Sequence, residues 1–491
     1  MLLRKWQLMN TFKRFISNAA LAYTSTVLSK LGNVVLFIII GRQYGPKDAG
    51  MFNLGITYLV VVLALSAWGL HEILVREAAP RLEQSARYFV NFLLFRLFLT
   101  ILAYGLLIGA LRFLLPYNEI TTNVIAIISL AVFPEATFAM AQALFSAHQQ
   151  LIFPTAGALI SSVFKIGAGY WLISNEQAIE NVIWVIPIGS TIGLLVLIPA
   201  ILLLFKKQKQ RASAMPNLRF CLINLRLTPG FILIGLFSTL DYQIDTFLIS
   251  FFFTEQQIGW YGAAQTIVLG FWMVAPAIRL SIFPLFSRYF IHSPPKLKIV
   301  YQKSTRYLLL IALPIAAGVT ILAEQIILFI YGPSFLPAVP VLQVMIWSII
   351  FAYIAVPAAR LILVNNRQKQ AGIMTGISML TTLILNLVML QVIGFIGAAV
   401  ARTASTALFY FMLLGYSQRF LIKNSFSSLI RGPLIAVILM SVVVWSLREL
   451  PMIVPITAGA LTYGAAALLV GAIPKEDRYY LYKFGSSAIN R

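Results

Sequence analysis

Residues 229–261 read PGFILIGLFSTLDYQIDTFLISFFFTEQQIGWY, and this stretch determines the class of fold. Its apolar run exceeds the roughly 20 residues that a helix needs to cross a bilayer, yet Asp241 and Asp245 lie in its middle. A helix would place Ser238, Asp241 and Asp245 on one face. A charge at bilayer depth costs about 2.5–3.5 kcal/mol or more, so it normally faces protein or a watery cavity. Each aspartate therefore either pairs with a buried Lys or Arg or, as we favour, lines an ion or substrate site.

The composition of the whole chain is that of a polytopic all-α membrane protein. Of its 491 residues, 60% are hydrophobic and only 11% are charged, and the mean hydropathy is +0.88. The net charge of +22 follows from the excess of Lys and Arg that cytoplasmic loops of membrane proteins carry, so we expect no nucleic-acid binding. Cys221 is the single cysteine, which excludes an intrachain disulfide and a thiolate metal site. We expect no metal and no cofactor.

About fourteen apolar segments have the length of transmembrane helices. With the N-terminus in the cytoplasm, the predicted inside segments hold 27 Lys and Arg and the outside loops hold 4. This asymmetry predicts a multi-pass protein of the cell (inner) membrane with both termini cytoplasmic. The predicted spans are 18–41, 49–73, 88–115, 120–146, 152–174, 181–205, 229–253, 258–286, 306–330, 337–364, 370–392, 395–417, 431–449 and 452–473.

An internal repeat predicts two lobes. Residues 31–62 and 240–271 both read as a helix, a short turn and a second helix, which opens with a glycine next to a bulky residue, Gly50 and Gly259. Six helices per lobe keep both lobes in the same orientation, so the repeat is a parallel pseudo-twofold around a central cavity, with the site near the midplane. The predicted division is an N-lobe at 1–205, a basic cytoplasmic linker at 206–228, a C-lobe at 229–418, and helices 13–14 with a cytoplasmic tail at 419–491.

Four stretches carry a resemblance to a known family. They are YGPKDAGMFNLGITYLVVVLALSAWGLHEILVREAA (44–79), IDTFLISFFFTEQQIGWYGAAQTI (244–267), FIYGPSFLPAVPVLQVM (329–345) and LILNLVMLQVIGFIGAAVARTAST (383–406). Their order and spacing resemble those of polysaccharide flippases of the MOP superfamily, the Wzx-type O-antigen and oligosaccharide repeat-unit translocases.

The resemblance implies a function in the biosynthesis of O-antigen, capsule or exopolysaccharide. A member of that family moves an undecaprenyl-diphosphate-linked oligosaccharide from the cytoplasmic to the periplasmic leaflet by alternating access. It also implies coupling to a proton or sodium gradient, contact with membrane lipids, and a polysaccharide polymerase as a further candidate partner. These sequences diverge too far for the resemblance to assign any single site residue.

The charges within the predicted spans suggest where an anionic head group would bind. Six cations stand against four anions: Lys30, Arg96, Lys165, Arg279, Arg360 and Arg402 against Glu135, Asp241, Asp245 and Glu324. A net positive interior suits a diphosphate, which Lys and Arg bind by charge-assisted hydrogen bonds. We therefore predict Lys30, Arg279, Lys165 and Arg402 as substrate-binding residues and Asp241, Asp245 and Glu135 as ion-coupling acids. Arg96 and Arg360 lie nearer the cytoplasmic ends, where they are expected to snorkel to the interface.

Three alternatives stay open. A lipid II flippase of the same superfamily would have the same helix count. A MATE-type drug or cation antiporter should have an acidic cavity, and the basic interior argues against it. A membrane glycosyltransferase or polymerase needs a sizeable external loop, and the predicted loops are short. We find no phosphate loop, zinc spacing or nucleophile triad, so we expect a transporter without catalytic residues rather than an enzyme.

Overall fold

The computed structural model describes residues 2–207, 217, 220–221, 229–273, 286, 288–290, 293–365, 367–420 and 426–473. It is 88% helical, and its described part contains no strand. Eleven helices in that part are long and apolar enough to cross a membrane, and Ile453–Leu469 is a shorter apolar helix. Two further helices correspond to the remaining predicted spans. The helix α11 (Pro229–Phe252) covers nearly all of 229–253, and α12 (Glu255–Trp272) covers the first part of 258–286. The all-α polytopic fold predicted from the sequence is confirmed.

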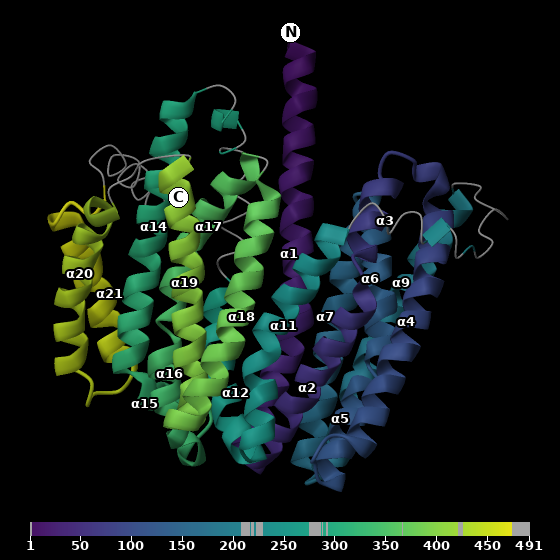
Figure 1. Cartoon of the computed structure of the whole chain (residues 1–491), viewed down its shortest axis with the longest axis horizontal. Coiled ribbons are helices and arrows are strands. Elements are labelled where there is room, and N and C mark those ends of the chain that lie inside the picture. Colours follow the sequence, from purple (N-terminus) through teal and green to yellow (C-terminus); the bar gives the residue numbers. More distant parts are fainter. Residues whose placement is uncertain are drawn as a thin grey trace, which may run out of the picture. The chain divides into compact units, whose positions relative to one another are not determined.

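The helices group into two compact units, and the first comprises Met1–Ala263 and Thr375–Ala398. Figure 1 labels most of its helices. Beside α11 and the start of α12, they are α1 (Leu2–Tyr44), α2 (Pro46–Ala67), α3 (Leu70–Ala78), α4 (Ser85–Phe113), α5 (Glu119–Ser129), α6 (Val132–Ala147), α7 (Ile152–Ser174), α8 (Ile179–Val182), α9 (Val185–Lys207) and most of α18 (Gln368–Ile393). A short 3-10 turn, η1 (Leu82–Gln84), precedes α4.

The second unit comprises Ala264–Met374 and Ala399–Arg491. Its helices are α14 (Pro294–Ile321), α15 (Ala323–Ile330), the 3-10 helix η2 (Pro333–Ala338), α16 (Val339–Met345), α17 (Ser348–Val364), α19 (Ile396–Phe420), α20 (Phe426–Ser446) and α21 (Ile453–Leu469). Tyr331 stacks on Phe335 at a centroid distance of 4.9 Å. Tyr463 of α21 donates a hydrogen bond to the Leu310 carbonyl of α14 at 2.7 Å. The predicted lobes at 1–205 and 229–418 stay a prediction.

The predicted span 49–73 is interrupted rather than continuous. Trp68 has φ 42° and Gly69 has φ 66°, so two consecutive left-handed residues separate α2 from α3. Glycine adopts this conformation without a steric cost. For Trp68 the indole Nε1 donates to the Leu65 carbonyl at 2.7 Å, which satisfies one of the free carbonyls at the end of α2. The predicted span 120–146 is likewise divided, into α5 and α6, with Pro134 in the first turn of α6.

The first turns of α2 and α12 cross in direct backbone contact. A Cβ at Gly50 would lie 1.7 Å from the carbonyl oxygen of Glu255, and a Cβ at Gly259 would lie 1.9 Å from that of Pro46. Each glycine thus faces the carbonyl four residues before the other, and the contact is reciprocal. Gly50 and Gly259 are also the equivalent glycines of the sequence repeat, so the two copies meet at matching positions with a local twofold relation.

Polar side chains reinforce this end of the unit. The Glu255 carboxylate at the start of α12 accepts hydrogen bonds from Asn118 Nδ2 and Thr121 Oγ1, each at 3.0 Å. Asn118 also caps α5 by accepting from the Thr121 backbone N–H at 2.7 Å, and such a cap stabilises a helix start by about 1 kcal/mol. Tyr117, in the preceding loop, lies 2.9 Å from the Tyr58 hydroxyl. The turn between α4 and α5 therefore holds the start of α12 against α2.

A short part of the predicted linker 206–228 packs on α4. Phe220 stacks on Phe92 with ring centroids 6.0 Å apart, and the Arg87 guanidinium lies 4.9 Å above the Phe220 ring. Cys221 is 2% exposed and belongs to the apolar core of this unit. The Asn91 side-chain oxygen accepts a hydrogen bond from a linker backbone N–H. Phe220 and Cys221 are thus packed against α4, whereas Asn217 is exposed.

Candidate functional site

The two aspartates of the opening stretch lie on α11 beside polar residues of α18. Thr382 Oγ1 donates to Asp241 Oδ1 at 2.8 Å, and Asn386 Nδ2 donates to Asp245 Oδ1 at 2.9 Å. Both pairs are 141 residues apart in the chain. Since residues four apart share a helix face, α11 and α18 run side by side in the same direction here. The predicted shared face of Asp241 and Asp245 is therefore a contact with α18.

Asp245 is the more enclosed of the two acids, with none of its surface exposed. Its second oxygen accepts a hydrogen bond from the Tyr261 hydroxyl of α12 at 2.7 Å. Asn386 is equally buried, and its Nδ2 also donates to the Thr382 carbonyl at 2.8 Å. The Asn386 side-chain oxygen, however, has no hydrogen-bond partner within the described residues. A buried acceptor beside a carboxylate is chemically suited to a small cation or a proton donor.

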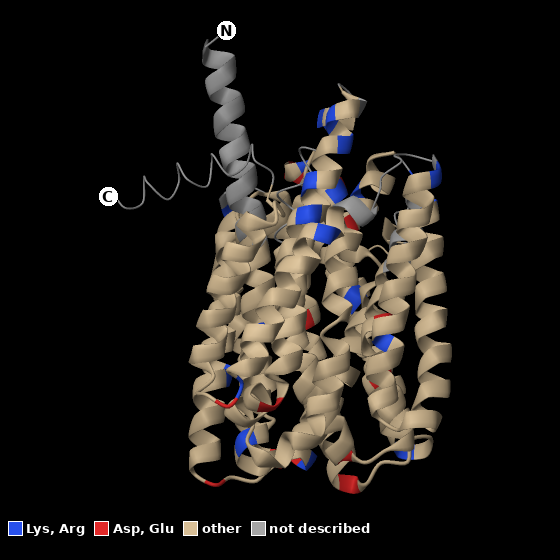
Figure 2. Ribbon diagram, turned by 90° about the vertical axis from the view of Figure 1, so that its left-hand side faces the viewer, with Lys and Arg blue, Asp and Glu red and all other residues tan. Residues whose placement is uncertain are grey.

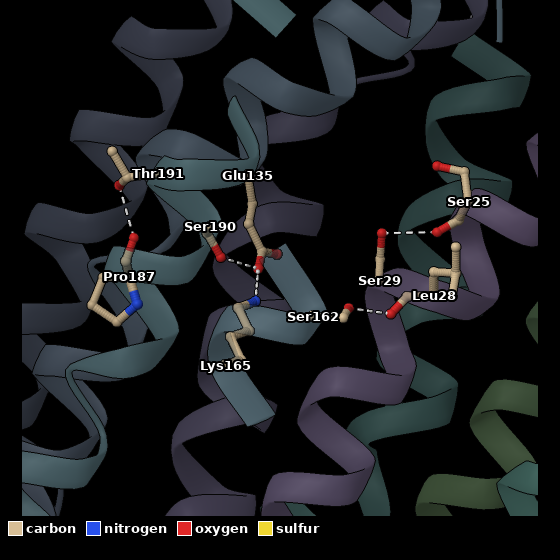
Figure 3. Close-up of polar contacts among 9 residues, drawn as sticks. All are labelled: Ser25, Leu28, Ser29, Glu135, Ser162, Lys165, Pro187, Ser190 and Thr191. Carbon is tan, nitrogen blue, oxygen red and sulfur yellow. Dashed lines mark hydrogen bonds and ion pairs between the residues drawn. The ribbon is translucent and has the colours of Figure 1, made fainter. Parts of the chain in front are cut away.

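Glu135, Lys165 and Ser190 form a second polar cluster, contributed by α6, α7 and α9. Figure 3 shows the Lys165 and Ser190 side chains pointing to the same oxygen of Glu135. Lys165 Nζ lies 3.6 Å from Glu135 Oε1, and Ser190 Oγ donates to the same atom at 2.9 Å. The sequence placed Glu135 and Lys165 in different roles, whereas the structure brings them together as an ion pair. Lys165 is almost fully enclosed, so a charged partner lowers the cost of its burial.

The second cluster lies at mid-depth of the bundle. Its three residues are each near the middle of a candidate span, namely Glu119–Ala147, Ile152–Ser174 and Ile179–Lys206. Few charged bands lie at mid-length of the helices, which are mostly tan in Figure 2. Small residues let the helices approach closely there: a Cβ at Gly189 would lie 2.6 Å from Lys165 Cγ, and one at Gly193 would lie 2.8 Å from Ser161 Cβ.

Lys30 lies on the side of α1 away from α7. Gly32 packs against Ser162 of α7, where a Cβ would lie 3.0 Å from the Ser162 Cα, and Ser162 Oγ donates to the Leu28 carbonyl at 2.5 Å. Lys30 is two residues from Gly32, on the opposite helix face, and its side chain is exposed. A Lys near the middle of a span normally faces protein or a watery cavity rather than lipid.

The other predicted cations are placed differently. Arg402 is 6% exposed on α19 of the second unit, and Arg279 lies outside the described residues. Arg96 was expected to snorkel, and this is wrong, because it is 4% exposed on α4 and its Nε has no hydrogen-bond partner within the described residues. Arg360 is half-buried on α17. Among the predicted site residues that the structure describes, Glu135 pairs with Lys165, and Asp241 and Asp245 share the face of α11 that contacts α18.

Sequence reasoning missed four polar partners, Tyr261, Thr382, Asn386 and Ser190. One signal was available, because Thr382 and Asn386 are four residues apart in an otherwise apolar helix. Such spacing places both on one face and indicates a buried polar contact. Within the described residues no three His, Cys, Asp or Glu side chains cluster as metal ligands would.

Comparisons with known proteins give the family. A family model described as polysaccharide biosynthesis protein matches residues 39–340, more than half of the chain. A Haloferax volcanii protein named "Probable low-salt glycan biosynthesis flippase Agl15" is 26% identical over 165 residues, which are 33% of this chain and 35% of that protein. The chain thus matches about a third of the length of this curated relative.

Two solved structures share the fold. The lipid II flippase MurJ in an inward closed conformation superposes with a TM-score of 0.71 at 16% identity, covering 92% of this chain and 98% of that one. An inward-facing multidrug resistance MATE family transporter of the MOP superfamily gives a TM-score of 0.66 at 13% identity, covering 82% and 96%. With its matched residues, the chain belongs to the polysaccharide biosynthesis protein family, as a multi-pass membrane protein that shares the fold of these two structures.

Proposed function

We propose that this protein is a flippase for a lipid-linked oligosaccharide in polysaccharide biosynthesis. It moves a polyprenyl-diphosphate-linked glycan, of the undecaprenyl type, from the cytoplasmic to the outer leaflet by alternating access. The observation that carries the proposal is the family match over residues 39–340 on a MOP-type helical bundle. The activity is transport, in which no covalent bond of the substrate changes.

The mid-membrane charges support an anionic substrate. Lys30 presents an exposed ammonium at mid-span, and Lys165 supplies a second cation at a similar depth. Lys and Arg form charge-assisted hydrogen bonds with phosphate oxygens. We assign Lys30, Lys165, Arg279 and Arg402 to the diphosphate group. An antiporter for organic cations would instead need unpaired acids facing the substrate, and both described acid clusters accept hydrogen bonds from protein donors.

Ion coupling is assigned to the acids of α11. Asp245 is fully buried, and the Asn386 side-chain oxygen beside it is an acceptor without a donor within the described residues. A proton or a sodium ion at this point would satisfy that acceptor and compensate the carboxylate charge. Binding there would favour one conformation by the difference in affinity between the two states. Glu135 is assigned to the same group of coupling acids.

The localisation and partners follow from the same proposal. The protein lies in the cell (inner) membrane with both termini in the cytoplasm, because the excess of Lys and Arg falls on the cytoplasmic side. Reporter fusions at residues 215 and 300 should then report cytoplasm, and fusions at 255 and 335 should report the outside. An outside signal at 215 would contradict this orientation. A polysaccharide polymerase is the proposed protein partner.

The function is tested by direct measurement of leaflet exchange. Proteoliposomes with the purified full-length chain and a fluorescent undecaprenyl-diphosphate oligosaccharide should lose dithionite-protected signal faster than protein-free liposomes. Lipid II and an organic cation dye serve as competing substrates in the same vesicles. Faster exchange of lipid II alone would favour the lipid II flippase, and dye transport alone would favour the MATE-type antiporter.

A further inference from the structure

Lys165 and Ser190 form an anion site that an acid of the chain itself occupies. A single oxygen, Glu135 Oε1, receives the Ser190 hydroxyl at 2.9 Å and lies 3.6 Å from Lys165 Nζ. A phosphate oxygen accepts from the same two kinds of donor as a carboxylate oxygen. Gly189, beside Ser190, leaves room for the Lys165 stem. The donors therefore come from α7 and α9, and α6 supplies the anion.

The exposure of the three side chains shows which of them can leave. The Glu135 side chain is 30% exposed, whereas the Lys165 side chain is 4% exposed and Ser190 is 5% exposed. The carboxylate is thus the outer member of the cluster, and it is carried on a flexible side chain. Rotation about its own side-chain bonds would uncover Lys165 and Ser190 without a movement of α6.

Glu135 and Lys165 form an ion pair that charged side chains of the neighbouring helices do not join, within the described residues. Within the described residues, Glu135 and Lys165 make no ion pair except with each other. Tyr170 of α7 is the one other ionisable side chain on α6 and α7, both of which lie wholly within the described residues. On the helices packed around them, the other titratable side chains that the structure describes are Tyr23, Lys30, Arg42 and Tyr44 on α1, Lys47, Asp48 and Tyr58 on α2, His71, Glu72, Arg76 and Glu77 on α3, Arg87, Tyr88, Arg96, Tyr104 and Arg112 on α4, Glu119 on α5, Glu180 on α8, and Lys206 on α9.

We propose that this cluster exchanges the Glu135 carboxylate for a phosphate oxygen of the lipid diphosphate and that Glu135 takes up one proton in the exchange. The proposal rests on the flippase function proposed above. When a phosphate oxygen binds Lys165 and Ser190, Glu135 loses its cation and gains an anionic neighbour in a medium of low dielectric. A solvent hydronium ion then gives a proton to a Glu135 oxygen, so one O–H bond forms on the carboxylate, one O–H bond of hydronium breaks, and a water molecule is left.

The exchange keeps the charge of the cluster constant. Before it, Lys165 is balanced by ionised Glu135, and after it, Lys165 is balanced by the phosphate while Glu135 is neutral. An uncompensated buried charge is thereby avoided at each stage. Because linkage is reciprocal, proton binding favours diphosphate binding as much as the diphosphate favours the proton. The affinity for a diphosphate should rise by about tenfold for each unit by which the pH falls, where Glu135 is otherwise ionised.

The test measures protons taken up on binding by the full-length protein in nanodiscs. Farnesyl diphosphate is titrated calorimetrically at pH 8 in buffers that differ in ionisation enthalpy. The wild type should take up about one proton more per ligand than Glu135→Gln, since that comparison removes any proton bound by the diphosphate. Glu135→Gln should still bind the ligand. Ser162→Ala, three residues before Lys165 on α7, is the matched control and should keep the wild-type uptake.

Further variants separate the outcomes. Lys165→Met should weaken farnesyl diphosphate binding at least about tenfold. If this variant fails to fold, Glu135→Gln/Lys165→Met replaces it, because the double variant leaves no unpaired charge. The double variant should show the same loss of affinity. Equal proton uptake by the wild type and Glu135→Gln would overturn the exchange while the flippase proposal stands. Absence of any farnesyl diphosphate binding by the wild type would overturn the exchange and diphosphate recognition together.

Discussion

Asn386 donates a hydrogen bond to Asp245 across 141 residues of chain, and the two side chains have no exposed surface. One turn earlier on each helix, Thr382 makes the same kind of contact with Asp241. Uncharged donors stabilise a carboxylate without fixing its charge as firmly as a cation would. These contacts surround the two proposed coupling acids with hydrogen-bond donors from Thr382, Asn386 and Tyr261.

Asp245→Asn should remove the response of transport to an ion gradient. The neutral amide cannot carry the charge on which coupling depends. Its NH2 group would also face the hydrogen-bond donor of Asn386 or Tyr261, where the carboxylate offered an acceptor. We therefore expect a loss of about 1–3 kcal/mol in the free energy of unfolding. Transport with and without imposed proton and sodium gradients is compared at equal membrane level. Thr239→Val, on the same helix, is the control and should retain the response. A variant at position 245 with undiminished response to both gradients would rule out the site.

Lys30→Ala should abolish glycan export while the protein stays in the membrane at its normal level. The exposed mid-span ammonium is assigned to the diphosphate, and its removal takes away a charge-assisted contact. Lys30→Arg should keep part of the activity, because the charge persists with a different geometry. Arg360→Ala, near the end of α17, should have a mild effect.

The competing explanation is that Lys30 only neutralises an acid. In that case Lys30→Ala/Asp241→Asn should recover the export that each single change loses. Surface glycan is measured for the wild type, the two single variants and the double variant. Recovery in the double variant would refute the role in substrate binding, and continued loss is the expected result.

Gly50→Ala and Gly259→Ala should each destabilise the protein. The added methyl group would meet a backbone carbonyl oxygen, at 1.7 Å for Gly50 and 1.9 Å for Gly259, and a backbone contact cannot be relieved by a rotamer change. Overpacking of this kind costs about 1–3 kcal/mol or more. Gly105→Ala is the matched control, since nothing lies within 4 Å of its added Cβ, and it should be neutral or slightly stabilising. Thermal unfolding in detergent gives the comparison.

Cys221 should react slowly with iodoacetamide in the wild type. Burial raises the pKa of its thiol to about 11 from the ordinary 9.0, so the reactive thiolate is scarce at neutral pH. Phe220→Ala should release the segment and speed the reaction at pH 8 by at least about tenfold. The wild-type rate should keep rising above pH 9, whereas the variant rate should level off there. Phe98→Ala, at an exposed position of α4, should behave as the wild type.

The fold was largely predictable because hydropathy identifies a spanning helix from its own residues. Asp241 and Asp245 could be placed on one face of a helix for the same reason. The break at Trp68–Gly69 was missed, since it depends on a left-handed backbone conformation at Trp68. Tryptophan rarely adopts that conformation, and the sequence contains no signal for it. The start of α14 at Pro294, twelve residues before the predicted span begins at 306, was missed because its first turns are basic.

The partners of the candidate residues could not be predicted, because they depend on which helices pack together. Lys165 and Glu135 are on separate helices, and no periodicity within either one states that they meet. Arg96 was misplaced for a related reason: snorkelling requires an unobstructed path along the helix, and the packing of neighbouring helices encloses it. Tyr261 was visible as part of the repeat, but its bond to Asp245 was not.

The reciprocal crossing of Gly50 and Gly259 also bears on how the chain could be divided. A contact in which each partner presents the same element to the other is isologous, the type found between identical subunits of a twofold dimer. A half-length polypeptide with one copy of the repeat could therefore make this crossing only by pairing with a second polypeptide. Separate expression of the two halves should leave each with an unmatched glycine surface, and co-expression should let them assemble through it.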